Sequence, residues 1–219
     1  VSHDLKSPLN ALRLGVRLLQ KRSEDEGRDE GERRQLLLLD RAVDRMERLL
    51  GDLLDMGRLR AGMLPLSRAA ERIASLVEDA LAEATPLGRE AGVDVRLEGP
   101  VPDVVVDCDR ERILQVLSNL VGNAVKFAGP GGRVFVAVAA GEHDVRFTVR
   151  DTGPGIRPDD LPHVFEPYWS AEGGRKLGTG LGLFIVRGLV EAHGGEAGVE
   201  TEPGAGTTFW FTLPRAGTA

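Results

Sequence analysis

Residues Gln115–Phe127, with the sequence QVLSNLVGNAVKF, form the stretch that decides the fold of this chain. Three shorter blocks follow it in order: Asp151–Ile156 (DTGPGI), Gly178–Leu183 (GTGLGL) and Gly204–Phe209 (GAGTTF). An asparagine-bearing helix, an acidic turn and two glycine-rich turns are the parts needed to hold a nucleotide with its metal ion. A single glycine motif often occurs by chance, whereas these blocks in this order, separated by strand and helix patterns, indicate a nucleotide site.

The composition of the 219-residue chain excludes several classes of protein. Apolar residues make up 42% and charged residues 28%, as in an ordinary soluble protein of one or two domains. A net charge of −6 gives no electrostatic reason to expect nucleic acid. No apolar run approaches the ~20 residues of a spanning helix, so we expect no membrane segment in this chain. Cys108 is the single cysteine, which argues against disulfides or a zinc cluster and suits a reducing cytoplasm.

Residues 1–60 are predicted to form an antiparallel pair of helices. Apolar side chains recur at alternating spacings of three and four, the pattern of a helical seam. The positions are Leu5, Leu9, Leu12, Val16 and Leu19 in the first helix and Leu36, Leu39, Val43, Met46, Leu50 and Leu53 in the second. The polar stretch Ser23–Gly31 would be the turn between them. Two helices alone make a poor core, so we expect a homodimer through residues 1–60, in which two hairpins complete a four-helix bundle.

The two predicted helices differ in length. Glu32–Arg60 would span about 43 Å and Val1–Lys21 about 31 Å. The longer helix would then have an end without a counterpart. We therefore expect the first helix to begin before Val1 and the chain to be part of a longer protein.

The sequence after residue 60 is predicted to contain both helices and strands. Residues 61–66 would be a linker, 67–215 a second domain and 216–219 a tail. The expected helices are Glu71–Glu90, Asp109–Phe127 and Leu181–His193, and the expected strands are Val93–Leu97, Val104–Cys108, Arg133–Ala140, Val145–Asp151, Gly195–Thr201 and Thr207–Leu213. Helices on one face of a mostly antiparallel sheet make an α/β sandwich. The whole chain is therefore predicted to be α+β, an antiparallel helical hairpin followed by an α/β sandwich.

Two asparagines mark one face of the helix in the first block. Asn119 and Asn123 are four residues apart, so their side chains share a face. Because asparagine is a poor residue for a helix interior, a functional role is indicated. Its amide oxygen is a ligand that Mg²⁺ accepts beside phosphate oxygens and water. The alternative is that the two side chains hydrogen-bond to neighbouring loops.

Asp151 ends a predicted strand in phase with the apolar Phe147 and Val149. Its carboxylate should therefore lie on the covered face, where it must find hydrogen-bond donors such as the amine of an adenine. Gly153 and Gly155 would let the backbone turn tightly and approach the base. The alternative is that Asp151 caps its own turn.

Gly178, Gly180 and Gly182 precede a predicted helix. The backbone N–H groups of such a turn, together with the positive end of the helix, suit a triphosphate. The polar, glycine-bearing stretch Glu172–Leu177 before this turn has the composition of a mobile lid.

These four blocks resemble the N, G1, G2 and G3 boxes of sensor histidine kinases, and Phe165–Trp169 (FEPYW) resembles their F box. The resemblance covers nearly the whole chain and implies a domain that binds ATP and Mg²⁺. Asn119 and Asn123 would face the phosphates and the metal, with Asn123 as the metal ligand. Lys126 would touch phosphate and Asp151 the adenine. The residues assigned to the ATP site are Asn119, Asn123, Lys126, Phe127, Asp151, Gly153, Gly155, Ile156, Gly178, Thr179, Gly180, Leu181, Gly182, Leu183 and Thr208.

Gyrase-type, mismatch-repair and heat-shock-chaperone ATPases share this nucleotide fold. They carry a glutamate four residues before the metal asparagine, where it activates water. Asn119 holds that place here and cannot act as a base. We therefore expect ATP to be held without being hydrolysed.

The beginning of the chain, Val1–Asn10 (VSHDLKSPLN), resembles the H box of the same family. His3 falls outside the leucine seam, and the resemblance makes it the phosphoryl acceptor and Asp4 the group that takes its proton. Ser7 holds the place of a threonine or asparagine that positions water for phosphatase activity. The phosphohistidine would then donate to an aspartate on the receiver domain of a response regulator.

Leu14 and Leu18 are apolar but lie outside the seam. They would form a docking surface for the receiver domain, or else pack against the second helix or the nucleotide domain. His143, His163 and His193 show no metal-ligand spacing, and we assign them structural roles.

The function indicated is ATP-dependent autophosphorylation on a histidine followed by phosphoryl transfer in two-component signalling. We expect a cytoplasmic location, either on its own or as the cytoplasmic part of a membrane-bound sensor. Two alternatives remain, a water-using ATPase of the shared fold and a dimeric scaffold without catalytic activity.

Overall fold

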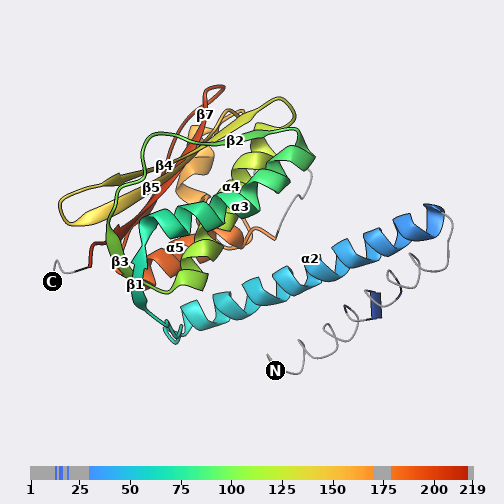
Figure 1. The fold of residues 1–219 in the computed structure, drawn as a ribbon, viewed down its shortest axis with the longest axis horizontal. Coiled ribbons are helices and arrows are strands. Elements are labelled where there is room, and N and C mark those ends of the chain that lie inside the picture. Colours follow the sequence, from blue (N-terminus) through green and yellow to red (C-terminus); the bar gives the residue numbers. More distant parts are fainter. Residues whose placement is uncertain (1–12, 14, 17–18, 20–29, 170–178, 217–219) are drawn as a thin grey trace. The chain divides into compact units, whose positions relative to one another are not determined.

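The computed structural model describes residues 13, 15, 16, 19, 30–169 and 179–216 (Figure 1). The chain forms two compact units, Val1–Arg60 and Ala61–Ala219. The predicted catalytic residues His3, Asp4 and Ser7, together with Leu14 and Leu18, lie outside the described residues.

The first unit is dominated by one long helix, α2 (Glu30–Arg60). Its predicted seam splits into two rows. Leu36 and Val43 are buried. Leu39, Met46 and Leu53, each seven residues from the next, are 51%, 42% and 52% exposed in the single chain. The described residues before α2, which are Arg13, Gly15, Val16 and Leu19, are helical. The guanidinium of Arg13 forms an ion pair with Glu47 of α2 at 2.8 Å.

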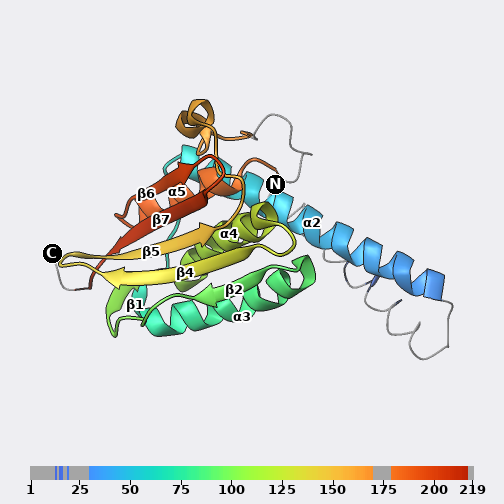
Figure 2. The same ribbon diagram turned by 90° about the horizontal axis from the view of Figure 1, so that it is seen from above.

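The second unit is built on a five-stranded sheet in the order β2-β4-β5-β7-β6 (Figure 2). Its strands are β2 (Asp94–Leu97), β4 (Arg133–Ala140), β5 (Asp144–Asp151), β6 (Ala197–Glu202) and β7 (Gly206–Pro214). β2 and β4 run parallel, and the other neighbouring pairs are antiparallel. A separate two-stranded sheet pairs β1 (Ala69–Arg72) with β3 (Val105–Cys108).

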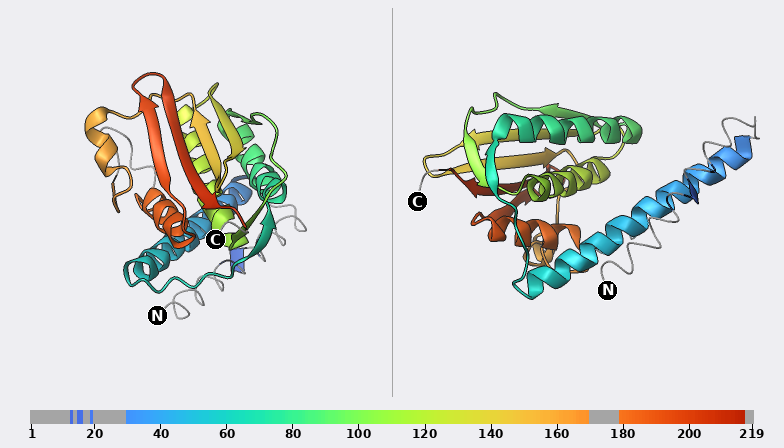
Figure 3. Two further views of the ribbon diagram at one scale, coloured as in Figure 1. Left: turned by 90° about the vertical axis from the view of Figure 1, so that its left-hand side faces the viewer. Right: turned by 60° about the horizontal axis from the view of Figure 1, so that its bottom comes forward.

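Three helices lie on one face of the five-stranded sheet (Figure 3). They are α3 (Ile73–Ala91), α4 (Arg110–Ala128) and α5 (Gly182–Ala192). Strands β4, β5 and β7 alternate buried and less buried side chains, because successive residues of a strand point to opposite faces. The covered face carries Phe147 and Phe211, whose rings stack with centroids 4.6 Å apart. The result is the predicted α/β sandwich.

The structure differs from the sequence-based expectation in two places. The helix expected from Glu71 begins at Ile73, because Glu71 and Arg72 belong to β1 and pair with Val106 and Val105. A 3₁₀ helix, Pro158–His163, was not predicted. Within residues 30–169 and 179–216, the other predicted helices and strands occur with boundaries that match or shift by one or two residues. The predicted helix Val1–Lys21 and turn Ser23–Gly31 lie mostly outside the described residues, and the predicted lid Glu172–Leu177 lies wholly outside them.

Two further expectations concern single features. Cys108 is fully buried, and burial is the main cause that raises the pKa of its thiol to about 12, so its role is in the core. Among the described residues, the helices are too short or too polar to cross a bilayer.

Replacing Phe147 by alanine should destabilise the second unit by about 3–5 kcal/mol, because it leaves a cavity against Phe211 in the centre of the core. Leu97→Ala, on an edge strand and 41% exposed in the native chain, should cost less than about 1 kcal/mol. Urea unfolding of both variants measures the difference. Equal losses would contradict the packing described here.

Candidate nucleotide-binding site

Helix α4 organises the candidate site. It begins at Asp109, whose carboxylate accepts a hydrogen bond from the backbone N–H of Arg112 at 3.2 Å and caps the helix. Its apolar stripe is buried, which leaves Asn119 and Asn123 half-buried on another face. A Cβ added to Gly182, the first residue of α5, would lie 3.3 Å from the amide oxygen of Asn119. The start of α5 therefore lies directly against this asparagine.

Asp151 is buried at the end of β5, as its phase with Phe147 and Val149 predicts. The residue is 3% exposed, and its Oδ1 accepts a hydrogen bond from the backbone N–H of Gly153 at 2.7 Å. Burial raises the pKa of the carboxyl group, and hydrogen bonds from the backbone of Gly153 and Thr207 act in the opposite direction. Asp151 therefore caps its own turn, which was the alternative considered from the sequence. It also accepts a hydrogen bond from the backbone of Thr207 in β7.

Glycines around Asp151 are required by close backbone contacts. Gly155 has φ 75°, and an added Cβ would lie 2.3 Å from the carbonyl oxygen of Glu202. Gly206 has φ 96°, and its added Cβ would lie 2.1 Å from the carbonyl oxygen of Asp151. The backbone N–H of Gly204 donates to Pro154 O at 2.7 Å. The acidic turn and the last glycine turn therefore form one tightly packed unit.

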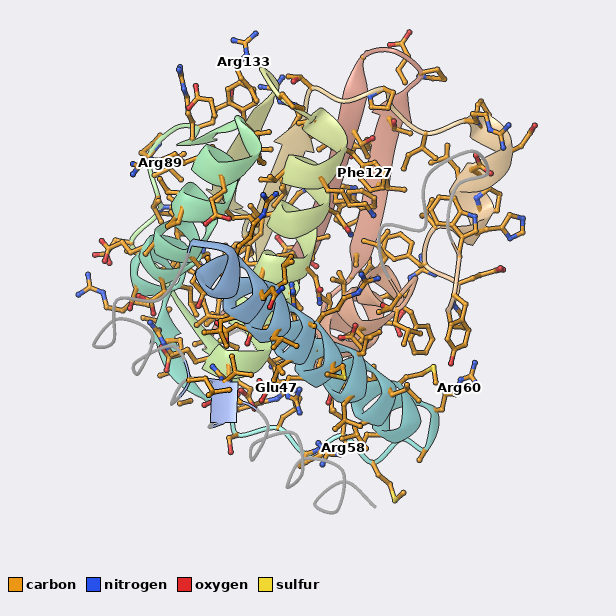
Figure 4. The ribbon with its side chains drawn as sticks, turned by 90° about the vertical axis from the view of Figure 1, so that its right-hand side faces the viewer. Glu47, Arg58, Arg60, Arg89, Phe127 and Arg133 are labelled. Atoms are coloured by element: carbon orange, nitrogen blue, oxygen red, sulfur yellow. The ribbon has the colours of Figure 1, made fainter. Side chains whose placement is uncertain are left out.

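The end of α4 meets the same acidic turn. A Cβ on Gly153 would lie 2.7 Å from the carbonyl oxygen of Phe127. Figure 4 labels Phe127 on the last turn of α4, and its side chain is 49% exposed. The ammonium of Lys126 lies 4.5 Å from the centre of the Phe127 ring, and burial lowers the pKa of this lysine. A partly desolvated cation at this place gains from an anionic partner.

The turn before α5 is held by the segment that resembles the F box. The backbone N–H of Tyr168 donates to Gly180 O at 2.8 Å. Gly180 has φ 70°, and an added Cβ would lie 2.7 Å from Tyr168 Cα. The hydroxyl of Thr179 accepts a hydrogen bond from the N–H of Leu181 at 3.1 Å, which fixes the last step into the helix.

The structure brings most of the predicted site residues together along α4, the acidic turn and the start of α5. Leu181 is buried in the core, and Ile156 and Leu183 are half-buried. Gly178 lies outside the described residues.

Thr208 is placed differently. Along β7, Thr207 and Phe209 are buried, whereas Thr208 lies between them on the alternate face. Thr207 is the residue whose backbone N–H bonds to Asp151. The structure therefore does not bring the Thr208 side chain to the Asp151 carboxylate. Phase with Phe209 and Phe211 was the sequence signal that could have identified Thr207.

The polar groups of the candidate site are better suited to a nucleotide than to a metal ion bound by protein side chains alone. Among residues 30–169 and 179–216 and the few described before them, no group of three or more His, Cys, Asp or Glu side chains could hold a metal ion. The buried carboxylate, the partly buried lysine and the glycine turns are instead matched to a base and to phosphates.

Comparisons with known proteins agree with this geometry. Residues 108–217 match the family of histidine kinase-, DNA gyrase B- and HSP90-like ATPases, and residues 1–62 match the His Kinase A (phospho-acceptor) domain. The chain belongs to the sensor histidine kinase family. The match at residues 1–62 covers the segment in which His3, Asp4 and Ser7 lie.

Relatives and solved structures extend the comparison over the whole chain. Sensor histidine kinase MtrB of Mycolicibacterium paratuberculosis is 37% identical over 98% of this chain and 38% of its own length. Histidine protein kinase DivJ of Caulobacter vibrioides is 35% identical over 98% of this chain and 36% of its own. The chain thus spans less than two fifths of either relative.

Two examples from the similar solved structures are ShkA and ThkA. Full-length ShkA in complex with AMPPNP has a TM-score of 0.78 and 35% identity, covering 100% of this chain and 45% of ShkA. The catalytic domain of histidine kinase ThkA has a TM-score of 0.62 and 30% identity, covering 68% of this chain and 96% of that domain. The nucleotide domain of this chain therefore has the fold of a histidine kinase catalytic domain.

Replacing Gly180 by alanine should weaken nucleotide binding by about tenfold or more, because the methyl group would collide with Tyr168 and displace the turn. Gly92→Ala is the matched control. Gly92 also has a positive φ, 69°, but its added Cβ meets only ordinary contacts with Pro130. It should lose stability without losing affinity for a fluorescent ATP analogue. Equal affinities for the two variants would contradict the assignment of this turn.

Replacing Asp151 by asparagine should change how the free energy of unfolding depends on pH. Burial raises the pKa of Asp151 above its usual value of 3.8, so the folded chain binds this proton more tightly than the unfolded chain. The group favours folding below pH 3.8, and that contribution is lost as pH rises through the raised folded pKa. Without nucleotide, the free energy of unfolding of the variant relative to wild type should therefore increase as the pH rises above 3.8 through the raised folded pKa.

Urea unfolding at several pH values measures this difference. Asp159→Asn, at an exposed position, controls for the loss of one charge. A difference between Asp151→Asn and wild type that does not change with pH would show that Asp151 is not buried in solution.

Proposed function

We propose that this chain binds Mg²⁺–ATP in its second unit, transfers the γ-phosphoryl group to His3 and passes it on to an aspartate of a response-regulator receiver domain. The observation that carries the proposal is the composition of α4. Its only carboxylate is Glu111, in the first turn, whereas Asn119 and Asn123 lie beside the nucleotide turns. A nucleotide held there meets no helix carboxylate able to activate water, so a side chain must receive the phosphoryl group.

The described residues supply binding and orientation. Asp151 would accept a hydrogen bond from the exocyclic amine of adenine, and the Gly153 turn lets the base approach. Lys126 and the Gly180 turn would face the phosphates. Asn123 would hold the metal ion through its amide oxygen, together with phosphate oxygens and water. When bound, Mg²⁺ neutralises the charge on the transferring phosphate.

The transfer step then needs one nucleophile and one proton acceptor. A ring nitrogen of His3 attacks the γ-phosphorus while the bond from that phosphorus to the β–γ bridging oxygen breaks, and ADP leaves with the electron pair. Asp4 takes the proton from the other ring nitrogen, so the imidazole remains nucleophilic. In the second reaction, the phosphohistidine donates the phosphoryl group to a receiver carboxylate. Ser7 has a hydroxyl that can orient water for dephosphorylation of the partner.

The exposed row on α2 supports a homodimer through residues 1–60. Leu39, Met46 and Leu53 recur every seven residues, which is the spacing of a helix packed along its length against another helix. Burial of three such side chains favours association by about 1.5–3 kcal/mol each before the costs of binding. The partner we propose is a second copy, so that two hairpins form a four-helix bundle. We further propose that the chain acts in the cytoplasm, within a longer sensor protein.

Incubation with γ-labelled ATP tests the proposed function. Wild type should take up label that is stable to base and labile to acid, and His3→Gln should take up none because the nucleophile is gone. His143→Gln is the matched control, since His143 lies in the exposed turn before β5 and should leave labelling unchanged.

Two results would contradict the proposal. ATP turnover that survives His3→Gln would indicate a water-using ATPase. Failure of wild type to bind Mg²⁺–ATP at millimolar concentrations would indicate a scaffold without catalytic activity.

A further inference from the structure

Three segments that lie far apart in the sequence meet at a buried histidine. His193 follows the last residue of α5 and is 1% exposed. Next to it are Asp109 at the start of α4 and Ser67–Arg68, the first residues after the predicted linker. From the sequence alone, we expect only a structural role for His193, at the end of a predicted helix.

Both ring nitrogens of His193 are used. Nδ1 lies 2.7 Å from the carbonyl oxygen of Leu189, and Nε2 lies 3.0 Å from the backbone nitrogen of Asp109. A carbonyl can only accept, so Nδ1 carries the proton and Nε2 accepts the N–H of Asp109. The imidazole thus joins the end of α5 to the beginning of α4 through two directed bonds. An apolar side chain of the same size could fill this place but could not accept that buried N–H.

Asp109, held by this bond, divides its carboxylate between two donors. Oδ1 accepts from the N–H of Arg112 at 3.2 Å and caps α4. Oδ2 accepts from the N–H of Ser67 at 2.8 Å. The guanidinium of Arg68 donates to the carbonyl oxygen of Ala192, the last residue of α5, at 2.6 Å. Ser67 and Arg68, the first residues after the linker, are therefore bonded to both helices.

The same two helices hold the nucleotide residues at their other ends. α4 and α5 are antiparallel: Asp109, before α4, meets His193, after α5, and Asn119, in the middle of α4, meets Gly182 at the start of α5. The views in Figure 3 show the two helices on the same face of the sheet. The helix pair thus connects Ser67 and Arg68, where the linker ends, with the Gly180 turn, which we propose faces the phosphates.

We propose that His193 is a positioning residue for phosphoryl transfer. His193 holds Asp109 in place, and Asp109 in turn bonds to Ser67; we call this chain of two hydrogen bonds the clamp. Because of the clamp, the linker leaves the nucleotide domain from a fixed point. This inference rests on the proposed function, because only a domain that must deliver its phosphate to another unit needs a fixed pivot.

The charge state of His193 fits this role. Burial is the main cause that lowers its pKa, the bond to Leu189 O acts in the opposite direction, Arg68 lowers the pKa further, and Asp107 and Asp109 raise it. The net result is a neutral ring, which an acceptor for the Asp109 N–H must be.

Loss of the clamp should slow transfer more than it weakens binding. The linker, residues 61–66, is short, so freeing Ser67 and Arg68 both lengthens the tether and loosens its orientation. The nucleotide end of the helix pair keeps its own packing, since Leu120 and Ile185 are buried there and make no contact through His193. The rate of autophosphorylation at saturating ATP should fall about threefold or more, with nucleotide affinity kept within about twofold.

The test compares three variants of the whole chain with one control. His193→Leu removes both hydrogen bonds of the ring and fills the same space with an apolar side chain. His193→Gln keeps an oxygen that can accept the Asp109 N–H. Asp109→Asn keeps one oxygen for the Arg112 cap but places an amide NH2 group, which cannot accept, where the second oxygen accepted from Ser67. His143→Leu makes the same chemical change at an exposed turn.

Hydrogen exchange of the Ser67 amide measures the clamp directly, without any need for activity. It should be faster by about tenfold in His193→Leu and Asp109→Asn, and close to wild type in His193→Gln and His143→Leu. The transfer rate should follow the same order. If His193→Leu does not fold, Asp109→Asn and His193→Gln make the same comparison.

Unchanged Ser67 exchange in His193→Leu and Asp109→Asn would overturn the inference, as would faster exchange with an unchanged transfer rate. If a variant only melts at a lower temperature, and neither the Ser67 exchange rate nor the transfer rate changes, His193 has a packing role alone and the inference is wrong. If wild type takes up no label, the proposed function fails, whereas the exchange experiment still decides whether the clamp exists.

Discussion

The carboxylate of Asp151 is buried at the end of a central strand, and the candidate site is arranged around the free-energy cost of that burial. A charge removed from water must be compensated by donors, or its pKa rises, and both effects occur here. Backbone N–H groups can approach closely only where no Cβ intervenes, which explains Gly153 and Gly206 beside this residue. Two backbone donors do not fill the capacity of a carboxylate, so an N–H group of a bound base can complete the set.

Helix α4 extends this arrangement over its whole length. Its last turn packs on the acidic turn through Phe127 O and Gly153, and its middle meets α5 at Asn119 and Gly182. Its N-cap residue, Asp109, is bonded to His193. A helix that is fixed at three points behaves as a rigid element. Its two ends therefore lie against the acidic turn and beside Ser67, the first residue after the predicted linker.

Periodicity made much of this predictable. A spacing of four placed Asn119 and Asn123 on one face, and a spacing of two buried Asp151 with Phe147. The same rule, not applied to β7, would have favoured Thr207 over Thr208. The features that were missed depend on partners distant in sequence. Strand β1 exists because β3 pairs with it, and His193 gains its role from Asp109, 84 residues away. A pattern within a short window contains no information about either contact.

The most direct test of this account compares the affinities of wild type for ATP and for purine riboside triphosphate, which carries a hydrogen in place of the exocyclic amine. A hydrogen bond to a buried carboxylate contributes about 1.5–3 kcal/mol, so ATP should bind about 10- to 150-fold more tightly. In Asp151→Ala, the two nucleotides should bind with similar affinity. Equal affinities of wild type for both nucleotides would contradict the central role given to the Asp151 carboxylate.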